Sequence, residues 1–413
     1  MSKIIRNIVA TTIFLAIPLM AYSQGVIEVK NSDLVAGRTY TWTKDNIYVL
    51  KDMVFVKPGS KLFIGPGTVI KAALGQGNNA TGLVISRGAQ IFAEGTASSP
   101  IIMTSIEDDL NILNPSLTKD DRGLWGGLVI LGAAGTNNQT PGGVRLIEGV
   151  NEIADPVSLA EYGGNNDNDN SGVLRYVSIR HSGINVGDVA GNEIQGLTLG
   201  GVGRGTTIEY VEVFASNDDG FEWFGGTVDA RFLVSAFNTD DAFDWDEGFR
   251  GRGQFWFAIQ DPYTQDDGYG RGMELDGAIG DEKGTPFAIP TLSNITILGA
   301  GLTAKPNAGD GSQLLIMRDN TGGKFYNSIF GDGAFFALTV EDVSAEAEFD
   351  SRKRLENGDI VFQNNLFWGF GNGNTSTTMF PQDFVRSVLT AQSNSNRLVD
   401  FKLRSLRDRK SVV

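Results

Sequence analysis

Acidic residues recur in the middle of the chain at a spacing that would gather several carboxylates. The segments NDDGFEWFGG (217–226) and TDDAFDWDEG (239–248) match at an offset of 22 residues, and GRGMELDGA (270–278) follows 30 residues further on. Aligning the three segments superimposes two sets of carboxylates, which are Glu222, Asp244 and Glu274, then Asp246 and Asp276. Like charges that close raise a pKa, pair with a base or share a cation.

One chemistry that these acidic columns fit is cation binding. Ca²⁺ takes about six to eight oxygen ligands, which stacked carboxylates and nearby turn aspartates can supply. We therefore predict a metal site at Glu222, Asp244, Asp246 and Glu274, with Ca²⁺ as the expected cofactor. Two alternatives stay open. The acids are solvated surface or turn residues, or they form a general acid–base pair.

Basic and aromatic residues near the acids are candidate ligand-binding residues. Arg271 stands three residues before Glu274, so at least one base should lie close to the acidic columns. Trp256 and the segment 261–270 are candidates for stacking against sugar rings, because an aromatic ring offers an apolar face. The alternative for Arg271, between two glycines, is that it marks only a turn, and Trp245 is expected in the core because it aligns with Trp223.

The histidine and cysteine content excludes several kinds of site. The chain has no cysteine and a single histidine, His181. A Cys–His nucleophile and a zinc site of the usual His/Cys kind are therefore excluded. We expect His181 to be structural, since its position aligns with Ala215 and Phe237 in similar strands. The formal net charge of −15 disfavours nucleic acid and anionic membranes as partners and attracts cations.

Internal repeats indicate the architecture that would position these residues. KLFIGPGTVIKA (61–72) and GLVISRGAQIFA (82–93) match at an offset of 21, and each contains a strand, a glycine turn and another strand. Repeats of this length fit one coil of a parallel β-helix, whose strands stack about 4.8 Å apart. A propeller blade would need about twice the period. We predict an all-β fold, a single-stranded right-handed parallel β-helix (a solenoid) with inserted loops.

Alternation within the repeats predicts which side chains face the core. The apolar columns are Phe221, Phe243 and Met273, then Trp223, Trp245 and Leu275. We expect them to point inward, because a buried carboxylate without a partner is strongly unfavourable. The intervening acids should then point to solvent. The offset of 21 likewise predicts that Leu62 lies over Leu83.

The two ends of the chain differ from its repetitive middle. Residues 1–23 have a basic start, an apolar stretch and a small-x-small cleavage site, and they are predicted to be a signal peptide. We expect export to the extracellular space, the cell surface or the periplasm, with no transmembrane segment in the mature chain. The β-helix is predicted over residues 24–400. We interpret residues 401–413 as an irregular tail that results from truncation into an adapter sequence.

Several stretches resemble a known group of proteins. VKPGSKLFIGPGTVI, LVISRGAQIFAEGTASSPIIMTS and GLWGGLVILG are similar to secreted parallel β-helix proteins common in Bacteroidetes, within the pectin-lyase-like superfamily. The resemblance covers about residues 54–370 and implies the fold, while most members are uncharacterised. It also implies a comparison with calcium-dependent pectate lyases, in which the acids would act with Arg271, Arg250 or Arg252. Their usual Arg-x-Pro-x-x-Arg run is absent, and of the polygalacturonase motifs only Asn238-Thr239-Asp240 is present.

These observations leave three expectations for function. The first is a secreted or cell-surface protein that binds a ligand, a polysaccharide or cell-surface glycan, on a cation-attracting acidic face. Arg250, Arg271 and Trp256 are its candidate ligand-binding residues. The second is a polysaccharide lyase or glycoside hydrolase that uses the same face, although no catalytic residue can be assigned. The third is a non-catalytic envelope or adhesion scaffold.

Overall fold

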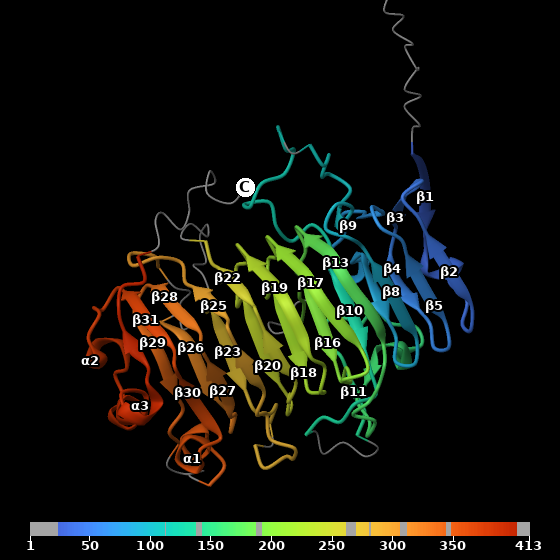
Figure 1. Cartoon of the computed structure of the whole chain (residues 1–413). Coiled ribbons are helices and arrows are strands. Elements are labelled where there is room, and N and C mark those ends of the chain that lie inside the picture. The colour runs from blue at the N-terminus through green and yellow to red at the C-terminus, as the bar shows by residue number, and fades with distance from the viewer. Residues whose placement is uncertain are drawn as a thin grey trace, which may run out of the picture.

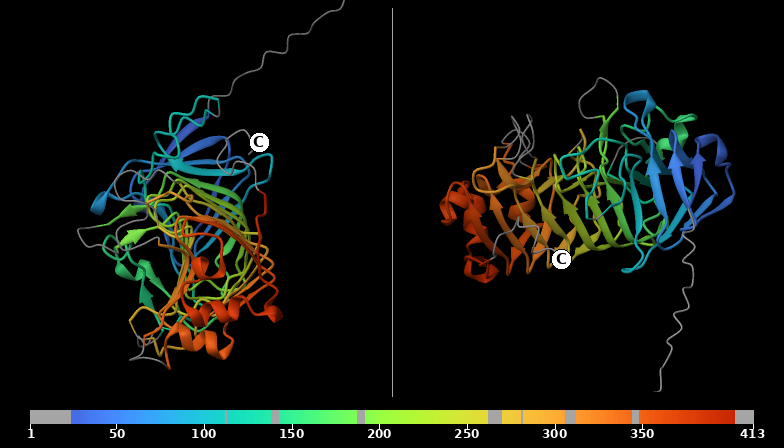
Figure 2. Two further views of the ribbon diagram at one scale, coloured as in Figure 1. Left: turned by 90° about the vertical axis from the view of Figure 1, so that its left-hand side faces the viewer. Right: turned by 90° about the horizontal axis from the view of Figure 1, so that it is seen from above.

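The chain folds into a parallel β-helix, which confirms the predicted all-β solenoid with inserted loops (Figure 1). The computed structural model describes residues 24–402 apart from 112, 138–142, 187–191, 262–269, 281, 306–311 and 344–347. The predicted signal peptide and most of the predicted tail lie outside the described residues. Viewed toward one end, the strands wind around a common interior, and from above they run in file along the molecule (Figure 2).

One side of the solenoid is a nine-stranded parallel sheet that carries the acidic columns. Each of its strands is short and begins after a turn that closes the preceding coil. In spatial order the strands are β4 (Met53–Val56), β7 (Gly82–Ile85), β10 (Leu128–Leu131), β16 (Leu197–Gly200), β18 (Phe221–Phe224), β20 (Phe243–Asp246), β23 (Met273–Asp276), β26 (Gln313–Arg318) and β29 (Phe336–Val340).

The other two sides belong to a 19-stranded sheet that bends around a corner. Its first side comprises β2 (Thr39–Trp42), β5 (Lys61–Ile64), β8 (Gln90–Glu94), β21 (Arg252–Gln254), β24 (Thr291–Ser293), β27 (Gly323–Tyr326) and β30 (Ile360–Gln363). Its second side comprises β1 (Gly25–Val29), β3 (Asn46–Leu50), β6 (Val69–Ala72), β9 (Ile101–Ser105), β22 (Phe257–Ile259), β25 (Thr296–Leu298), β28 (Ile329–Gly333), β31 (Leu366–Phe370) and β32 (Arg397–Leu398).

Three longer strands run through the corner without a break. They are β13 (Gly172–Arg180), β17 (Thr207–Phe214) and β19 (Ala230–Ala236). The early part of β13 pairs with β8 and its later part with β9, so the strand serves both sides. Tyr176, Tyr210 and Phe232 make the bend in the left-handed backbone region. Their rings stack face to face at 4.4 Å spacings, and each ring therefore covers its neighbour.

The interior is filled by the apolar columns that the alternation predicts. Phe221 pairs in register with Phe243, and Phe243 with Met273. Trp223, Trp245 and Leu275 form the neighbouring column, and all six side chains are fully buried. Each such side chain contributes about 1.5–3 kcal/mol by leaving water. This column fixes the register of the acids between its members.

The predicted stacking of Leu62 on Leu83 is wrong. Leu62 in β5 pairs with Ile91 in β8, whereas Leu83 in β7 pairs with Val54 in β4 and Leu128 in β10. The offset of 21 therefore compares different sides of the solenoid. Every side of a coil has the same plan of short strand, glycine turn and short strand, so sequence similarity alone does not identify the side.

A lobe of inserted segments covers the outer face of the first half of the nine-stranded sheet. We define this outer lobe by β11 (Arg145–Leu146), β12 (Glu161–Tyr162), β14 (Ile184–Asn185), β15 (Glu193–Ile194) and the residues between β11 and β12. Its apolar side chains form a second core with outward-facing residues of the sheet. Tyr162 reaches as far as Phe224 in β18, with ring centroids 6.1 Å apart.

Short helices close the C-terminal end of the solenoid (Figure 1). They are α1 (Ser351–Asn357), α2 (Ser376–Met379) and α3 (Asp383–Leu389). Val385 and Leu389 of α3 join the main core, which caps the last coil. No helix in the described part of the chain is long and apolar enough to span a membrane.

Candidate functional site

The acidic residues of the repeats align on the outer face of the nine-stranded sheet. Glu222 of β18 pairs with Asp244 of β20, and Asp244 pairs with Glu274 of β23. Asp246 pairs with Phe224, two residues further along the same strands than Asp244 and Glu222. The predicted alignment of these acidic residues on neighbouring strands is therefore confirmed. Whether they bind a metal remains a prediction.

These carboxylates point outward, but the expectation that they face solvent is wrong. Glu222 is only 7% exposed, and Asp246 and Asp276 are buried as well, while Asp244 and Glu274 are half-buried. The outer lobe contributes to this burial, since its Glu148 is close enough to raise the pKa of Glu222. Sequence alternation identifies the outer face of a sheet, but it does not indicate whether an insertion covers that face.

Burial changes the protonation of the acids. Loss of hydration raises the pKa of Glu222, Asp244 and Asp246 well above the usual range, and the neighbouring carboxylates raise it further. Burial and Glu274 also raise the pKa of Asp276, to about 7, although Arg318 acts in the opposite direction. A bound cation would favour the ionised form of these groups.

One end of the acidic face is neutralised by arginines. The Arg271 guanidinium lies 2.7 Å from a Glu274 carboxylate oxygen and 3.6 Å from one of Asp241. Arg318, which follows in register on β26, lies 2.6 Å from Glu274 and 2.8 Å from Asp276. Glu274 is thus held between two guanidinium groups. Of the four predicted metal ligands, it is the one that already has cationic partners.

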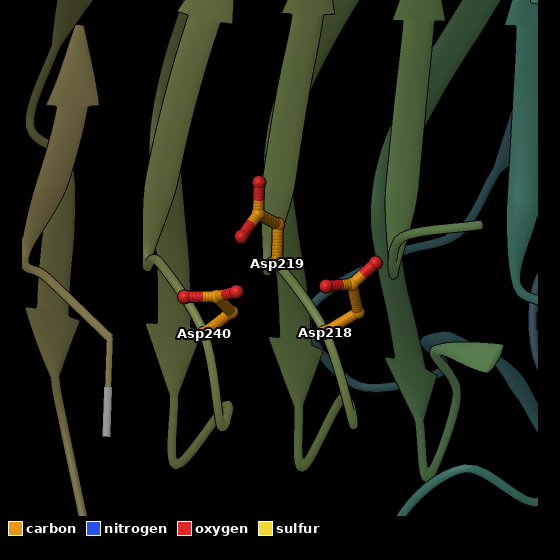
Figure 3. A group of neighbouring side chains, drawn as sticks. All are labelled: Asp218, Asp219 and Asp240. Atoms are coloured by element: carbon orange, nitrogen blue, oxygen red, sulfur yellow. The ribbon is translucent and has the colours of Figure 1, made fainter. Parts of the chain in front are cut away.

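The other end contains carboxylates that converge on one another. Asp219, Glu222 and Asp244 each place an oxygen within 4.8 Å of the others, and Asp218, Asp219 and Asp240 form a second such group. We call these five residues the acidic patch. Among the described residues, no ion pair involves Asp218, Asp219, Glu222 or Asp244. Figure 3 shows Asp218 and Asp219 in the turn before β18 and Asp240 in the turn before β20.

Three oxygens of the acidic patch lack a hydrogen-bond partner although they are inaccessible to solvent. They are Asp218 Oδ2, Glu222 Oε2 and Asp244 Oδ1. An unsatisfied buried polar atom costs about 1–3 kcal/mol, and a charged one costs more. Hard cations such as Ca²⁺ bind carboxylate oxygens, so the donor set of the patch fits such an ion. A divalent cation would satisfy these oxygens and neutralise their charge together.

The sequence analysis named turn aspartates as possible Ca²⁺ ligands, but its predicted metal site did not include Asp218, Asp219 and Asp240. Asp218, Asp219 and Asp240 belong to the Asp-Asp pairs that precede each acidic strand. The signal was present, because both repeats contain this pair at the same position. It was assigned to turn formation, which is the usual role of aspartate in such places. Asp219 also has that role, since its Oδ1 accepts a hydrogen bond from the Asp241 amide at 2.9 Å.

The candidate ligand-binding residues lie elsewhere than expected. Trp256 is 1% exposed, stacks on Trp223 at 4.9 Å and donates from Nε1 to the Ala230 carbonyl, so a groove role is contradicted. The left-handed Phe255 directly before it turns the corner and directs Trp256 inward. The neighbouring candidate segment 261–270 lies outside the described residues except at its two ends.

The two candidate arginines, Arg271 and Arg250, make hydrogen bonds and ion pairs within the protein. Arg271 is 3% exposed and its charge is used within the acidic face. Arg250 donates to the carbonyls of Gly135 and Gly248 and to Asp167 at 2.6 Å, which ties an inserted loop to the coil. His181 is buried and bonds the Asp121 carbonyl through Nδ1 at 2.6 Å, in agreement with a structural role.

A polar cavity lies away from the acidic patch. It has a volume of about 490 Å³ and lies along β17, β19, β21 and β24. Arg231 and Arg252 line it, but each is paired, with Glu209 and Asp229 respectively. The lining, which also includes Arg204, therefore contains both basic and acidic side chains, unlike the acidic patch.

Comparison with known proteins identifies the family. No curated protein and no solved structure matches the chain. The family model described as a pectate-lyase like beta helix domain matches residues 35–398, which is most of the chain. This match agrees with the three-sided parallel solenoid and indicates a carbohydrate-related protein. The chain belongs to the pectate-lyase-like β-helix family.

Proposed function

We propose that this chain is an exported β-helix protein that binds a divalent cation in its acidic patch and, with the cation in place, binds an acidic glycan. The observation that carries the proposal is the set of inaccessible, unpartnered oxygens on Asp218, Glu222 and Asp244. Asp219, Glu222 and Asp244 would hold the ion, and Ca²⁺ suits their all-oxygen donor set.

The charge of the protein explains why a cation would be needed for glycan binding. At a formal charge of −15 the protein repels a polyanion, and the acidic face adds to this repulsion. A bound divalent ion weakens the local negative field and offers a coordination position to a sugar carboxylate. The half-buried Asp244 and Glu274 provide the route by which ligand would approach.

The enzyme alternatives lack a specific observation in their favour. A lyase needs a base that can reach the sugar, and Arg271 is buried in ion pairs with Glu274 and Asp241. We therefore propose binding as the function and treat turnover as an outcome that the same experiment detects.

The proposal is tested by measuring glycan binding with Ca²⁺ and with chelator. A panel of immobilised polysaccharides that includes polyuronates and neutral glycans should show Ca²⁺-dependent retention of the wild-type protein on the acidic members. Glu222→Gln should lose that retention, whereas Asp229→Asn on another side of the solenoid should keep it. Equal binding in chelator would contradict the role of the cation. Release of unsaturated uronides or of reducing ends would show that the protein is an enzyme and would overturn the proposal that it only binds the glycan.

A further inference from the structure

The acidic patch consists of two carboxylate groups that share one member. Asp218, Asp219 and Asp240 form the first group, and Asp219, Glu222 and Asp244 form the second. Within each group one oxygen of every residue lies within 4.8 Å of the others. The first group lies in the turns before β18 and β20 (Figure 3), and the second group continues into the strands themselves with Glu222 and Asp244. Asp219 lies where they meet.

Each group contains its own unsatisfied buried oxygen. In the first, Asp218 is 7% exposed and its Oδ2 has no hydrogen-bond partner. In the second group, Glu222 is also 7% exposed, and its Oε2 has no hydrogen-bond partner. A single ion held by the second group would leave Asp218 Oδ2 unsatisfied, because Asp218 is not a member of that group.

Charge also favours a second ion. When ionised, Asp218, Asp219, Glu222 and Asp244, which make no ion pair with the described residues, carry four negative charges. One divalent cation would neutralise two of these charges, and two cations would neutralise all four. The known arginine partners, Arg271 and Arg318, are directed to Asp241, Glu274 and Asp276.

We infer that the acidic patch is a paired divalent-cation site in which Asp219 bridges the two ions. This inference rests on the proposed function and goes beyond it, because the proposed function needs one ion only. A carboxylate offers about four lone-pair positions. The Asp241 amide uses one position on Asp219 Oδ1 and fixes the orientation of the group. Carboxylate-bridged metal ions typically lie about 3.5–4 Å apart.

Native mass spectrometry of the full chain after chelator treatment tests the stoichiometry with Ca²⁺ as the probe. The wild type should bind two ions per chain. Asp218→Asn and Glu222→Gln should each bind one, because each removes a ligand of one group only. Asp219→Asn should bind none at the same Ca²⁺ concentration. Asp229→Asn is the matched control and should bind two, since Asp229 pairs with Arg252 on another side of the solenoid.

Electron paramagnetic resonance with Mn²⁺ then distinguishes a bridged pair from two separate sites. Mn²⁺ suits the same oxygen donors. At one equivalent the wild type should give a six-line signal, and at two equivalents the coupling between adjacent ions should broaden that signal and reduce its intensity. Asp218→Asn should keep the six-line signal at saturation. Circular dichroism and the unfolding midpoint of each variant show that it is folded, and a folded variant is expected, because Asn and Gln preserve shape and remove a buried charge.

The outcomes separate the pair from the proposed function. Two ions with a coupled signal support the pair. One ion in the wild type, unchanged in Asp218→Asn and lost in Glu222→Gln, overturns the pair and leaves the single-ion proposal intact. Two uncoupled ions overturn the bridge. Absence of any bound ion at millimolar Ca²⁺ overturns both.

Discussion

The two ends of one acidic face have the same residue types and opposite electrostatics. At the β23 end, Glu274 and Asp276 lie against Arg271 and Arg318. At the β18 end, Asp218, Asp219, Glu222 and Asp244 have no basic partner among the residues that the structure describes. The strands are equivalent, and the acids occupy the same outward positions. The difference arises from which residue follows on the next coil and in the preceding turn.

The comparison shows how a solenoid can use one motif in two ways. Where an arginine is in register, the carboxylates are neutralised by the protein itself. Where none is, the same carboxylates require protons or cations from solution. Buried ion pairs are seldom a source of net stability, but removal of one partner is strongly destabilising. Substitutions and ligand addition at each end of the acidic face test this difference.

Removal of the arginine should make the neutralised end resemble the acidic patch. In Arg271→Met, Glu274 and Asp241 lose a buried partner, and stability should fall by about 3–5 kcal/mol, as expected for an uncompensated buried charge. The midpoint of guanidinium unfolding measures the loss. Arg271→Lys is the matched control and should recover part of it. An unchanged midpoint in Arg271→Met would mean that the ion pairs do not matter, and the comparison would fail.

Addition of Ca²⁺ should stabilise the wild type through the acidic patch. At 100 times the dissociation constant, one bound ion stabilises the folded state by about 2.7 kcal/mol. The thermal midpoint of chelator-treated protein should therefore rise on addition of Ca²⁺, and the rise should be lost in Asp244→Asn, which removes a ligand of the patch. Asp244→Asn should also be more stable than wild type in chelator, since the amide is neutral without taking up a proton on burial. A full Ca²⁺ response in this variant would place the ion elsewhere.

In chelator, stability should fall as pH rises from 6.5 to 8.5. The folded pKa values of Asp276 and Glu148 are raised to about 7, above their ordinary values of 3.8 and 4.5. Between the two values the folded state holds a proton that the unfolded state has released, so the stabilisation is present at low pH and is lost through about pH 7. The window lies above the range in which His181 titrates. Burial lowers the pKa of His181, so its effect on stability at lower pH is opposite: stability rises with pH there. A midpoint that rises over this window without Ca²⁺ would contradict the raised pKa values.

Disruption of an exposed ion pair on another side should have the smallest effect. Arg252→Ala removes the contact with Asp229, in which the arginine side chain is 77% exposed. Exposed pairs contribute about 0–1 kcal/mol. The unfolding midpoint should change little and the Ca²⁺ response should not change at all. A large loss would show that burial is not what distinguishes the acidic face.

Much of the fold could be predicted because a β-helix repeats its pattern along one axis. The alternation of Phe221, Trp223, Phe243 and Trp245 predicts the inward columns and the register correctly. The match of Leu62 to Leu83 failed because all sides of a coil share one strand–turn–strand plan. Register within a series with distinctive aromatics was predictable, whereas the assignment of short aliphatic strands to sides was not.

The site was predictable only in part, since its character depends on long-range contacts. The acidic columns follow from the repeats, but their burial depends on the outer lobe, which returns to the sheet from a distant part of the sequence. Arg318 lies 42 residues after its partner Asp276, and nothing local to either indicates the pair. Trp256 was misplaced because a single left-handed residue, Phe255, reverses the alternation at the corner.

The most direct test is a crystal structure of the protein grown with Mn²⁺ and measured for anomalous scattering. An anomalous peak is expected among Asp219, Glu222 and Asp244, next to the buried oxygens that lack a hydrogen-bond partner. The neutralised end at Glu274 and Asp276 should show none. No peak at the acidic patch, with its carboxylates protonated and bonded to one another or to water, would contradict the account.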